Sequence, residues 1–166
     1  MDTLTGTWRL EPATATIEFH QKNFFGLMNV KGGFDRFSGT LDLSATPAAT
    51  LTIEAASINT GSGQRDKHLR SKDFFDVDNH PEIRFESHSA NQDGAVVHLF
   101  GQLKGAGGSA PLEFDAALTN IAEGMSVEIE TSIAPRALGI TWNPLGMMRG
   151  PSTLIVRGRL TRAQAS

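Results

Sequence analysis

Alternation of apolar and polar residues with a period of two runs through most of the sequence. Residues 17–22 read Ile-Glu-Phe-His-Gln-Lys, and the stretches 51–55, 83–88, 112–118 and 127–131 follow the same pattern. Successive side chains of a strand point to opposite faces of its sheet. Each stretch therefore predicts a strand with one apolar face and one wet face.

Four further stretches are strand candidates, namely 7–10, 29–44, 95–103 and 152–162. The turn signals that separate the strands are Asp93-Gly94, Gly105–Gly108, Glu123-Gly124 and Thr46-Pro47. Strands with one apolar face must pack on one another as a sandwich or close into a barrel. No helical pattern alternates with them, so a parallel sheet is not expected.

Two segments depart from the alternation. Residues 63–75 are charged and lack β-branched side chains, which predicts one or two helical turns. Residues 137–151 are rich in Gly, Pro and Met, which predicts a long loop. The flexible methionines and Trp142 suit a mouth or lid over an apolar ligand, and they equally suit a plug over a barrel end.

Composition limits the function classes. With 166 residues, 39% hydrophobic and 20% charged, the chain is expected to form one globular domain over residues 1–166. The net charge is −3 and no stretch is a basic run, which argues against binding to nucleic acid or to anionic lipid surfaces. The sequence contains no cysteine, which excludes disulfides, zinc thiolates and cysteine nucleophiles.

No segment approaches the roughly 20 apolar residues of a membrane span, so no integral membrane segment is expected. Residues 1–10 have neither a basic region nor an apolar core typical of a signal peptide. We therefore expect a cytoplasmic protein, or a periplasmic or secreted one if a signal has been removed.

The charged segment around residues 65–73 allows three interpretations. His68 could act as a general base oriented by Asp66 or Asp73. Arg65, Lys67 or Arg70 could instead contact a pyrophosphate or carboxylate head group. The segment could also be a solvated short helix whose local ion pairs contribute little.

Metal and nucleotide sites are not indicated. The five histidines form neither a His-x-His nor a His-Glu-x-x-His pattern. The glycine-rich Gly105–Gly108 lacks the following Lys-Ser/Thr of a phosphate loop, so a hairpin turn is the simpler interpretation. We expect no cofactor and no metal.

A series of motifs runs along most of the chain, and its members are Trp8–Pro12, Ala15–Phe19, Val30–Phe34 with Phe37, Ser57–Thr60, Gln64–Leu69, Asp73–Phe75, His80–Phe85, Gly101–Leu103, Gly105–Gly108 and Ala137–Ile140. The most specific block is Arg-Asp-x-His-Leu, Phe-Phe and Pro-x-Ile-x-Phe between residues 65 and 85. In their order and spacing these motifs make the chain resemble the YceI-like family of polyisoprenoid-binding, lipocalin-like proteins over roughly residues 7–162.

The resemblance implies an all-β fold: a single antiparallel barrel of about eight strands with one or two short helical segments. It also implies that the interior binds a long-chain isoprenoid or fatty-acyl ligand without acting on it as an enzyme. Two alternatives stay open: an enzyme that uses His68 as acid and base on such a lipid, and a partner-binding module with a filled core. Because exposed strand edges are a liability in a monomer, a homodimer through a strand edge or a loop is a further hypothesis.

Ligand-binding residues are expected on the inner face and at the mouth of this barrel. Many family members have His at the end of the second strand, where this chain has Asn23. The head group is expected near Asn23, Arg65 or Trp142, with Met147 in the neighbouring loop. Parity and the resemblance together place the following residues around the ligand chain: Ile17, Phe19, Val30, Phe34, Leu51, Ile53, Phe74, Phe85, Leu99, Leu112, Phe114, Ile129 and Ile155.

Overall fold

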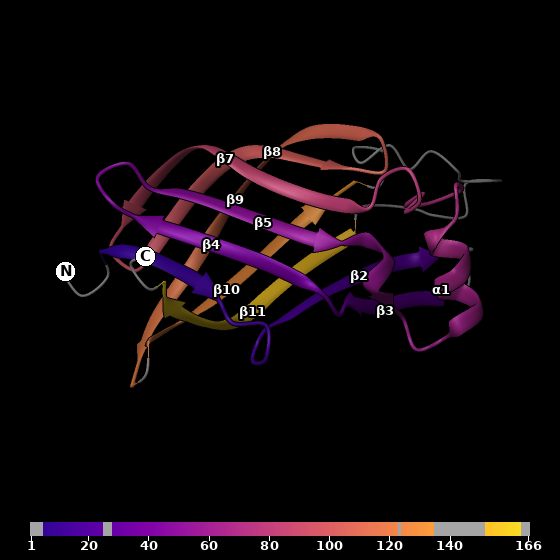
Figure 1. Cartoon of the computed structure of the whole chain (residues 1–166), viewed down its shortest axis with the longest axis horizontal. Coiled ribbons are helices and arrows are strands. Elements are labelled where there is room, and N and C mark those ends of the chain that lie inside the picture. Colours follow the sequence, from indigo (N-terminus) through magenta and orange to yellow (C-terminus); the bar gives the residue numbers. More distant parts are fainter. Residues whose placement is uncertain (1–4, 25–27, 123, 135–151, 164–166) are drawn as a thin grey trace.

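Eight antiparallel strands close into a barrel in the computed structural model, which describes residues 5–24, 28–122, 124–134 and 152–163. The side chains of residues 22–24 and 28–30 lie outside this description. The strands of the described chain are β1 (Gly6–Leu10), β2 (Thr16–Phe24), β3 (Met28–Phe34), β4 (Phe37–Leu43), β5 (Ala48–Glu54), β6 (Ile58–Asn59), β7 (Glu82–Asp93), β8 (Val96–Gly105), β9 (Gly108–Ile121), β10 (Gly124–Ile133) and β11 (Ser152–Arg162) (Figure 1).

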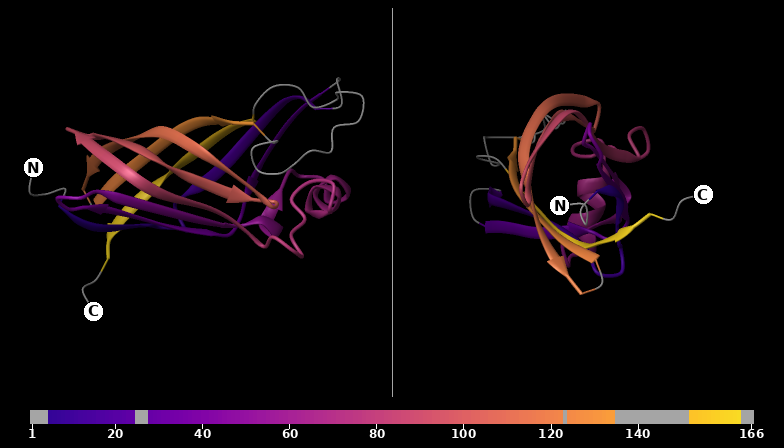
Figure 2. Two further views of the ribbon diagram at one scale, coloured as in Figure 1. Left: turned by 90° about the horizontal axis from the view of Figure 1, so that it is seen from above. Right: turned by 90° about the vertical axis from the view of Figure 1, so that its left-hand side faces the viewer.

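The barrel follows the order β1-β4-β5-β7-β8-β9-β10-β11 and returns to β1. Closure comes from β1 and β11, whose register runs from Trp8↔Arg162 to Leu10↔Leu160. The right-hand view of Figure 2 shows these strands as a ring. Closing the ring removes the unpaired strand edges that an open sheet would expose.

Strand β11 has two partners on the side of β1. Its last residues pair with β1, whereas residues 152–157 pair with β2. Strand β2 pairs with β3, and β3 pairs in turn with the two-residue β6. This branch extends the barrel wall toward the end at which the only helix of the described residues, α1 (Gly63–Arg70), is found (Figure 1).

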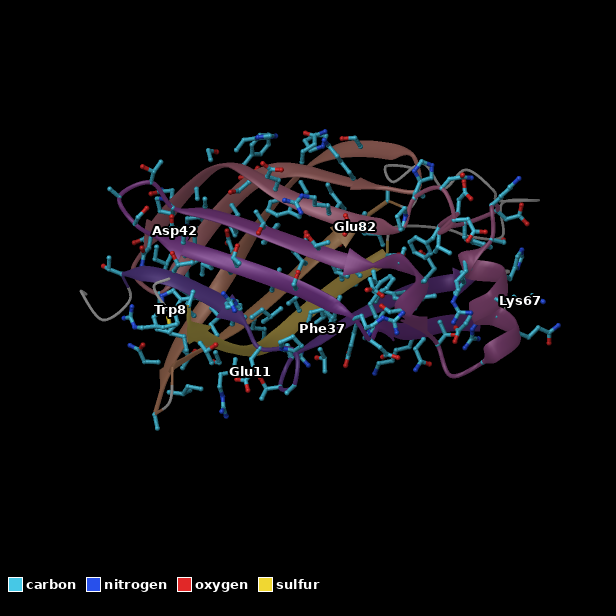
Figure 3. All side chains as sticks on the ribbon, in the orientation of Figure 1. Trp8, Glu11, Phe37, Asp42, Lys67 and Glu82 are labelled. Carbon is cyan, nitrogen blue, oxygen red and sulfur yellow. The ribbon has the colours of Figure 1, made fainter. Side chains whose placement is uncertain are left out.

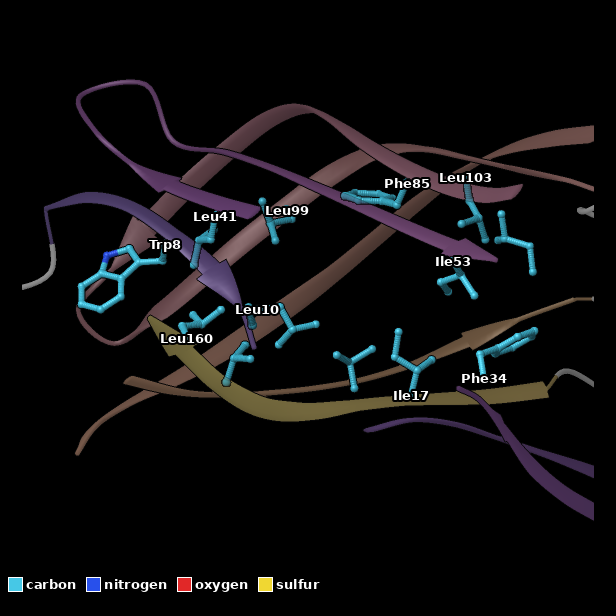
Figure 4. Packing of buried hydrophobic residues seen from close by; sticks show 14 of the residues in the cluster. Trp8, Leu10, Ile17, Phe34, Leu41, Ile53, Phe85, Leu99, Leu103 and Leu160 are labelled. Atoms are coloured by element: carbon cyan, nitrogen blue, oxygen red, sulfur yellow. The ribbon is translucent and has the colours of Figure 1, made fainter. Parts of the chain in front are cut away.

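The opposite end of the barrel is filled by side chains. Trp8 is 4% exposed and Met125 is fully buried. The guanidinium of Arg162 lies 4.4 Å from the centre of the Trp8 ring. Figure 4 shows Trp8 and Leu160 at this closed end, with Phe34 and Leu103 far from it. The barrel therefore has one plugged end and one end covered by α1 and its neighbours.

The structure confirms the predicted fold class and the five most regular strands, which lie in β2, β5, β7, β9 and β10. The expected helical turns occur as α1, which Ser62 caps by accepting a hydrogen bond from the Arg65 amide. A 3₁₀ turn at Ala55–Ser57 accompanies it. The candidate strand 29–44 is divided into β3 and β4. The predicted loop 137–151 lies outside the described residues.

Candidate functional site

An elongated cavity occupies the barrel interior. It contains about 1490 Å³ of space that no protein atom fills, counted with the solvent at its mouth. Every strand of the closed ring contributes to its wall, together with β2, β3, α1 and the turn after α1. Alternation explains the wall, since the inner face of each strand carries its apolar residues. At the end of the barrel the charged side chain of Lys67 on α1 points outward (Figure 3).

The wall of the cavity is almost entirely hydrocarbon. None of the described residues that line it carries a charge. Phe85 and Phe114 pack against each other with ring centres 4.9 Å apart, and Phe34 contacts both Phe19 and Phe75 at 5.8 and 5.9 Å. Tilted and edge-to-face rings of this kind form rigid surfaces against which an apolar chain can pack.

Three apolar residues close the end of the cavity near α1. Leu69 belongs to α1, and Phe74 and Phe75 belong to the turn that follows it. The amide of Phe75 donates to the Leu69 carbonyl at 3.0 Å, which folds the turn back onto the helix. Leu69 and Phe74 are buried, at 5% and 4% exposure. This short segment is therefore the cover of the cavity at that end.

A polar clamp at Thr60 holds the cover in place. The buried carboxylate of Asp66 accepts hydrogen bonds from the Thr60 amide at 2.9 Å and from its hydroxyl at 2.5 Å. The Arg65 guanidinium donates to the Thr60 hydroxyl and carbonyl, both at 2.8 Å. Arg65 does not line the cavity. These contacts give Arg65 and Asp66 a structural role in fixing α1 to the strand before it.

His68 and Asp73 form a surface pair beside the cover. The His68 Nε2 lies 3.1 Å from an Asp73 carboxylate oxygen, and the His68 side chain is 40% exposed. The His68 ring stands edge-on to Phe74, with centres 5.1 Å apart. Asp73 is thus the carboxylate beside His68, whereas Asp66 is held by Thr60.

Gln21 and Ser152 form a polar pair within the apolar wall. Gln21 is only 3% exposed, and its side-chain oxygen accepts a hydrogen bond from the Ser152 hydroxyl. Gln21 and Ser152 are also cross-strand partners of β2 and β11. Neither residue is among the ligand-binding residues expected from the sequence, although Gln21 shares the parity of Ile17 and Phe19.

The structure brings most of the predicted inner-face residues to the cavity. Those that line it are Phe19, Phe34, Leu51, Ile53, Phe74, Phe85, Leu99, Leu112, Phe114 and Ile129. Ile17 is buried at 1% exposure but lies outside the lining. The side chains of Asn23 and Val30, and all of Trp142 and Met147, lie outside what the structure describes. That any of these residues contacts a ligand stays a prediction.

The placement of Ile155 on the inner face was wrong. Ile155 pairs with Glu18 of β2 and Glu130 of β10, whereas its neighbours Leu154 and Val156 line the cavity. Three consecutive apolar residues hide the parity of this strand. Arg157 and Arg159 share the parity of Ile155 and mark its face as the outer one.

Lining residues outside the predicted set lie on strands of the barrel, on α1 and in the turn after α1. They include Leu10, Leu41, Leu69, Phe75, Ile83, Leu103, Val127, Ile133, Leu154, Val156 and Leu160. Among the residues that the structure describes, no three His, Asp or Glu side chains gather as metal ligands. No helix in the same part of the chain has the length and apolar character needed to cross a bilayer.

Comparison with known proteins bears on this site. The family model of the YceI-like domain matches residues 8–157. A UPF0312 protein of Pectobacterium atrosepticum is 36% identical over 108 residues, which cover 63% of this chain and 56% of that protein. The match thus spans little more than half of that relative's length.

Two solved structures share the fold. BcnA of Burkholderia cenocepacia superposes with a TM-score of 0.80 at 17% identity, covering 91% of this chain and 98% of that one. A polyisoprenoid binding domain from Saccharophagus degradans, implicated in plant cell wall breakdown, gives a TM-score of 0.69 at 14% identity, covering 93% and 99%. At these identities the likeness concerns the fold alone.

Proposed function

The chain belongs to the YceI-like family, and from this premise we propose that its barrel binds one long-chain isoprenoid, or a lipid amphiphile of similar length, and carries or sequesters it without chemistry. The observation that carries the proposal is the uncharged, elongated cavity with its aromatic wall. The polyisoprenoid binding domain of similar fold supports the choice of ligand class.

The size of the cavity sets an upper limit on the ligand. A water molecule takes up about 30 Å³, and a methylene group is of similar size. The 1490 Å³ of the cavity therefore hold at most about 50 such groups. Each buried methylene contributes roughly 0.8 kcal/mol, so a chain of about twenty carbons gains on the order of 16 kcal/mol before the cost of immobilising it. Hydrophobic burial alone is sufficient for tight binding.

A second function is an enzyme that acts on such a lipid. The observation that favours it is the His68–Asp73 pair, since the His68 ring lies against Phe74 and Phe74 lines the cavity. A histidine beside a carboxylate is a common general base. Its position on the outside of the cover, 40% exposed, favours the carrier.

A displacement titration tests the proposal. The protein is first freed of co-purified lipid, and the methyl ester of cis-parinaric acid, an uncharged fluorescent straight-chain polyene, is titrated into it. We expect saturable binding of one probe per chain and its full displacement by geranylgeraniol. Absence of saturable binding by both compounds would contradict the proposal and favour a barrel that serves as a partner-binding module.

A further inference from the structure

Three of the five polar residues that line the cavity lie close together. Gln21 of β2, Thr131 of β10 and Ser152 of β11, named here the polar tip, lie on the inner faces of three adjacent strands. Ser152 pairs with both Gln21 and Ile133, and Thr131 lies one inward-facing position before Ile133. The two other polar residues of the lining, Thr40 and Thr50, bond to each other through their hydroxyls at an exposed position.

The polar tip lies away from the plugged end of the barrel. Met125, at that end, and Thr131 belong to the same strand, and six residues of a strand span roughly 20 Å. Between them the inner face of β10 presents Val127 and Ile129. An amphiphile whose tail fills the plugged end therefore brings its head to the polar tip.

The chemistry of the polar tip suits an uncharged head. The Ser152 hydroxyl donates a hydrogen bond to the side-chain oxygen of Gln21. The lone pairs of the Ser152 oxygen can therefore accept a hydrogen bond. A buried anion requires a cation or several donors, because its desolvation is otherwise uncompensated. The described cavity lining supplies no cation, and the Arg65 guanidinium is bonded to Thr60.

Resting on the proposed function, we propose that the polar tip binds the uncharged polar head of the ligand, a hydroxyl, amide or carbonyl, and that the cavity selects against an anionic head such as a pyrophosphate. Gln21 and Ser152 are the specificity-determining residues. The apolar wall then determines affinity, and the polar tip determines which end of the ligand lies near α1.

Three compounds that share one tail and differ in the head test this inference. Geranylgeraniol, geranylgeranyl diphosphate and the hydrocarbon of the same chain are compared by displacement of the uncharged methyl ester of cis-parinaric acid from the wild-type protein. A single neutral hydrogen bond corresponds to about fivefold in affinity, so we expect the alcohol to bind about fivefold more tightly than the hydrocarbon. We expect the diphosphate to bind at least about tenfold more weakly than the alcohol.

The variants Gln21→Leu and Ser152→Ala should each remove the advantage of the alcohol over the hydrocarbon. The matched controls are Gln102→Leu and Ser109→Ala, because Gln102 and Ser109 form a similar pair at 2.9 Å outside the cavity lining. These controls should keep the preference. The affinities of the three ligands for the wild-type protein test the neutral-head inference even if a variant fails to fold.

The outcomes separate this inference from the proposed function. Equal binding of alcohol and hydrocarbon, or tighter binding of the diphosphate, would overturn the neutral-head inference while the carrier stands. Retention of the preference in folded Gln21→Leu and Ser152→Ala would overturn the role of the polar tip. Failure of all three ligands to displace the probe would overturn both proposals.

Discussion

Replacing Ala116 by phenylalanine separates an open cavity from a filled core. Ala116 lies in β9, is 2% exposed and lines the cavity. Its cross-strand partners are Val97 and Ile129. A phenylalanine at this position must project into the interior of the barrel, because Ala116 faces inward.

An open cavity and a filled core predict opposite changes in the free energy of unfolding. In a filled core the larger side chain overpacks, and the free energy of unfolding falls by about 1–3 kcal/mol. In an open cavity it gains hydrophobic burial of up to about 2 kcal/mol, so the free energy of unfolding stays constant or rises. If the ring displaces five ligand carbons at about 0.8 kcal/mol each, binding weakens by about 4 kcal/mol, nearly a thousandfold in Kd.

Urea denaturation of the lipid-free protein and displacement of the cis-parinaric acid methyl ester by geranylgeraniol measure the two effects. The matched control is Ala117→Phe, since Ala117 is the next residue of β9 and faces solvent. The control should leave ligand binding unchanged. A destabilised Ala116→Phe variant that still binds the ligand at full affinity would refute the reasoning.

Three further variants test the cover, the plug and the enzyme alternative. Asp66→Ala removes two hydrogen bonds to Thr60 and should lower the free energy of unfolding by roughly 3 kcal/mol in urea denaturation; an unchanged value would contradict the clamp. Trp8→Ala should cost about 3–5 kcal/mol in the same assay, because Trp8 is buried at the plugged end; a loss below 1 kcal/mol would show that the plug contributes little. His68→Ala should leave lipid affinity in the displacement titration within about twofold, because His68 lies outside the cavity lining; loss of turnover of a prenyl substrate would instead establish an enzyme.

The alternation of apolar and polar residues along the strands predicted most of the fold and much of the cavity wall. It placed Phe19, Phe85 and Phe114 on the inner face because their neighbours along the strand are charged or polar. It failed at Ile155, where three apolar residues follow one another and each fits either face. Strand pairing resolves the ambiguity, since Ile155 lies opposite two glutamates.

Parity alone could not separate a buried residue from a cavity-lining one. Ile17 has the expected face, but the barrel packs around it and leaves it outside the cavity lining. The roles within the charged segment also depended on tertiary contacts. Arg65 is an expected head-group ligand by residue type, yet its donors are directed to Thr60. Gln21 passed unnoticed because a single polar residue on an apolar face has no sequence signature of binding.

The most direct test of the central claim, that the cavity holds one long apolar molecule, is native mass spectrometry of the protein purified from its own host. Denaturing extraction and mass analysis then identify whatever is released. We predict one lipid per chain, with a mass that fits a series of five-carbon units and an uncharged head. The account would be contradicted if the protein purifies without a bound lipid and also does not bind added prenyl or acyl chains.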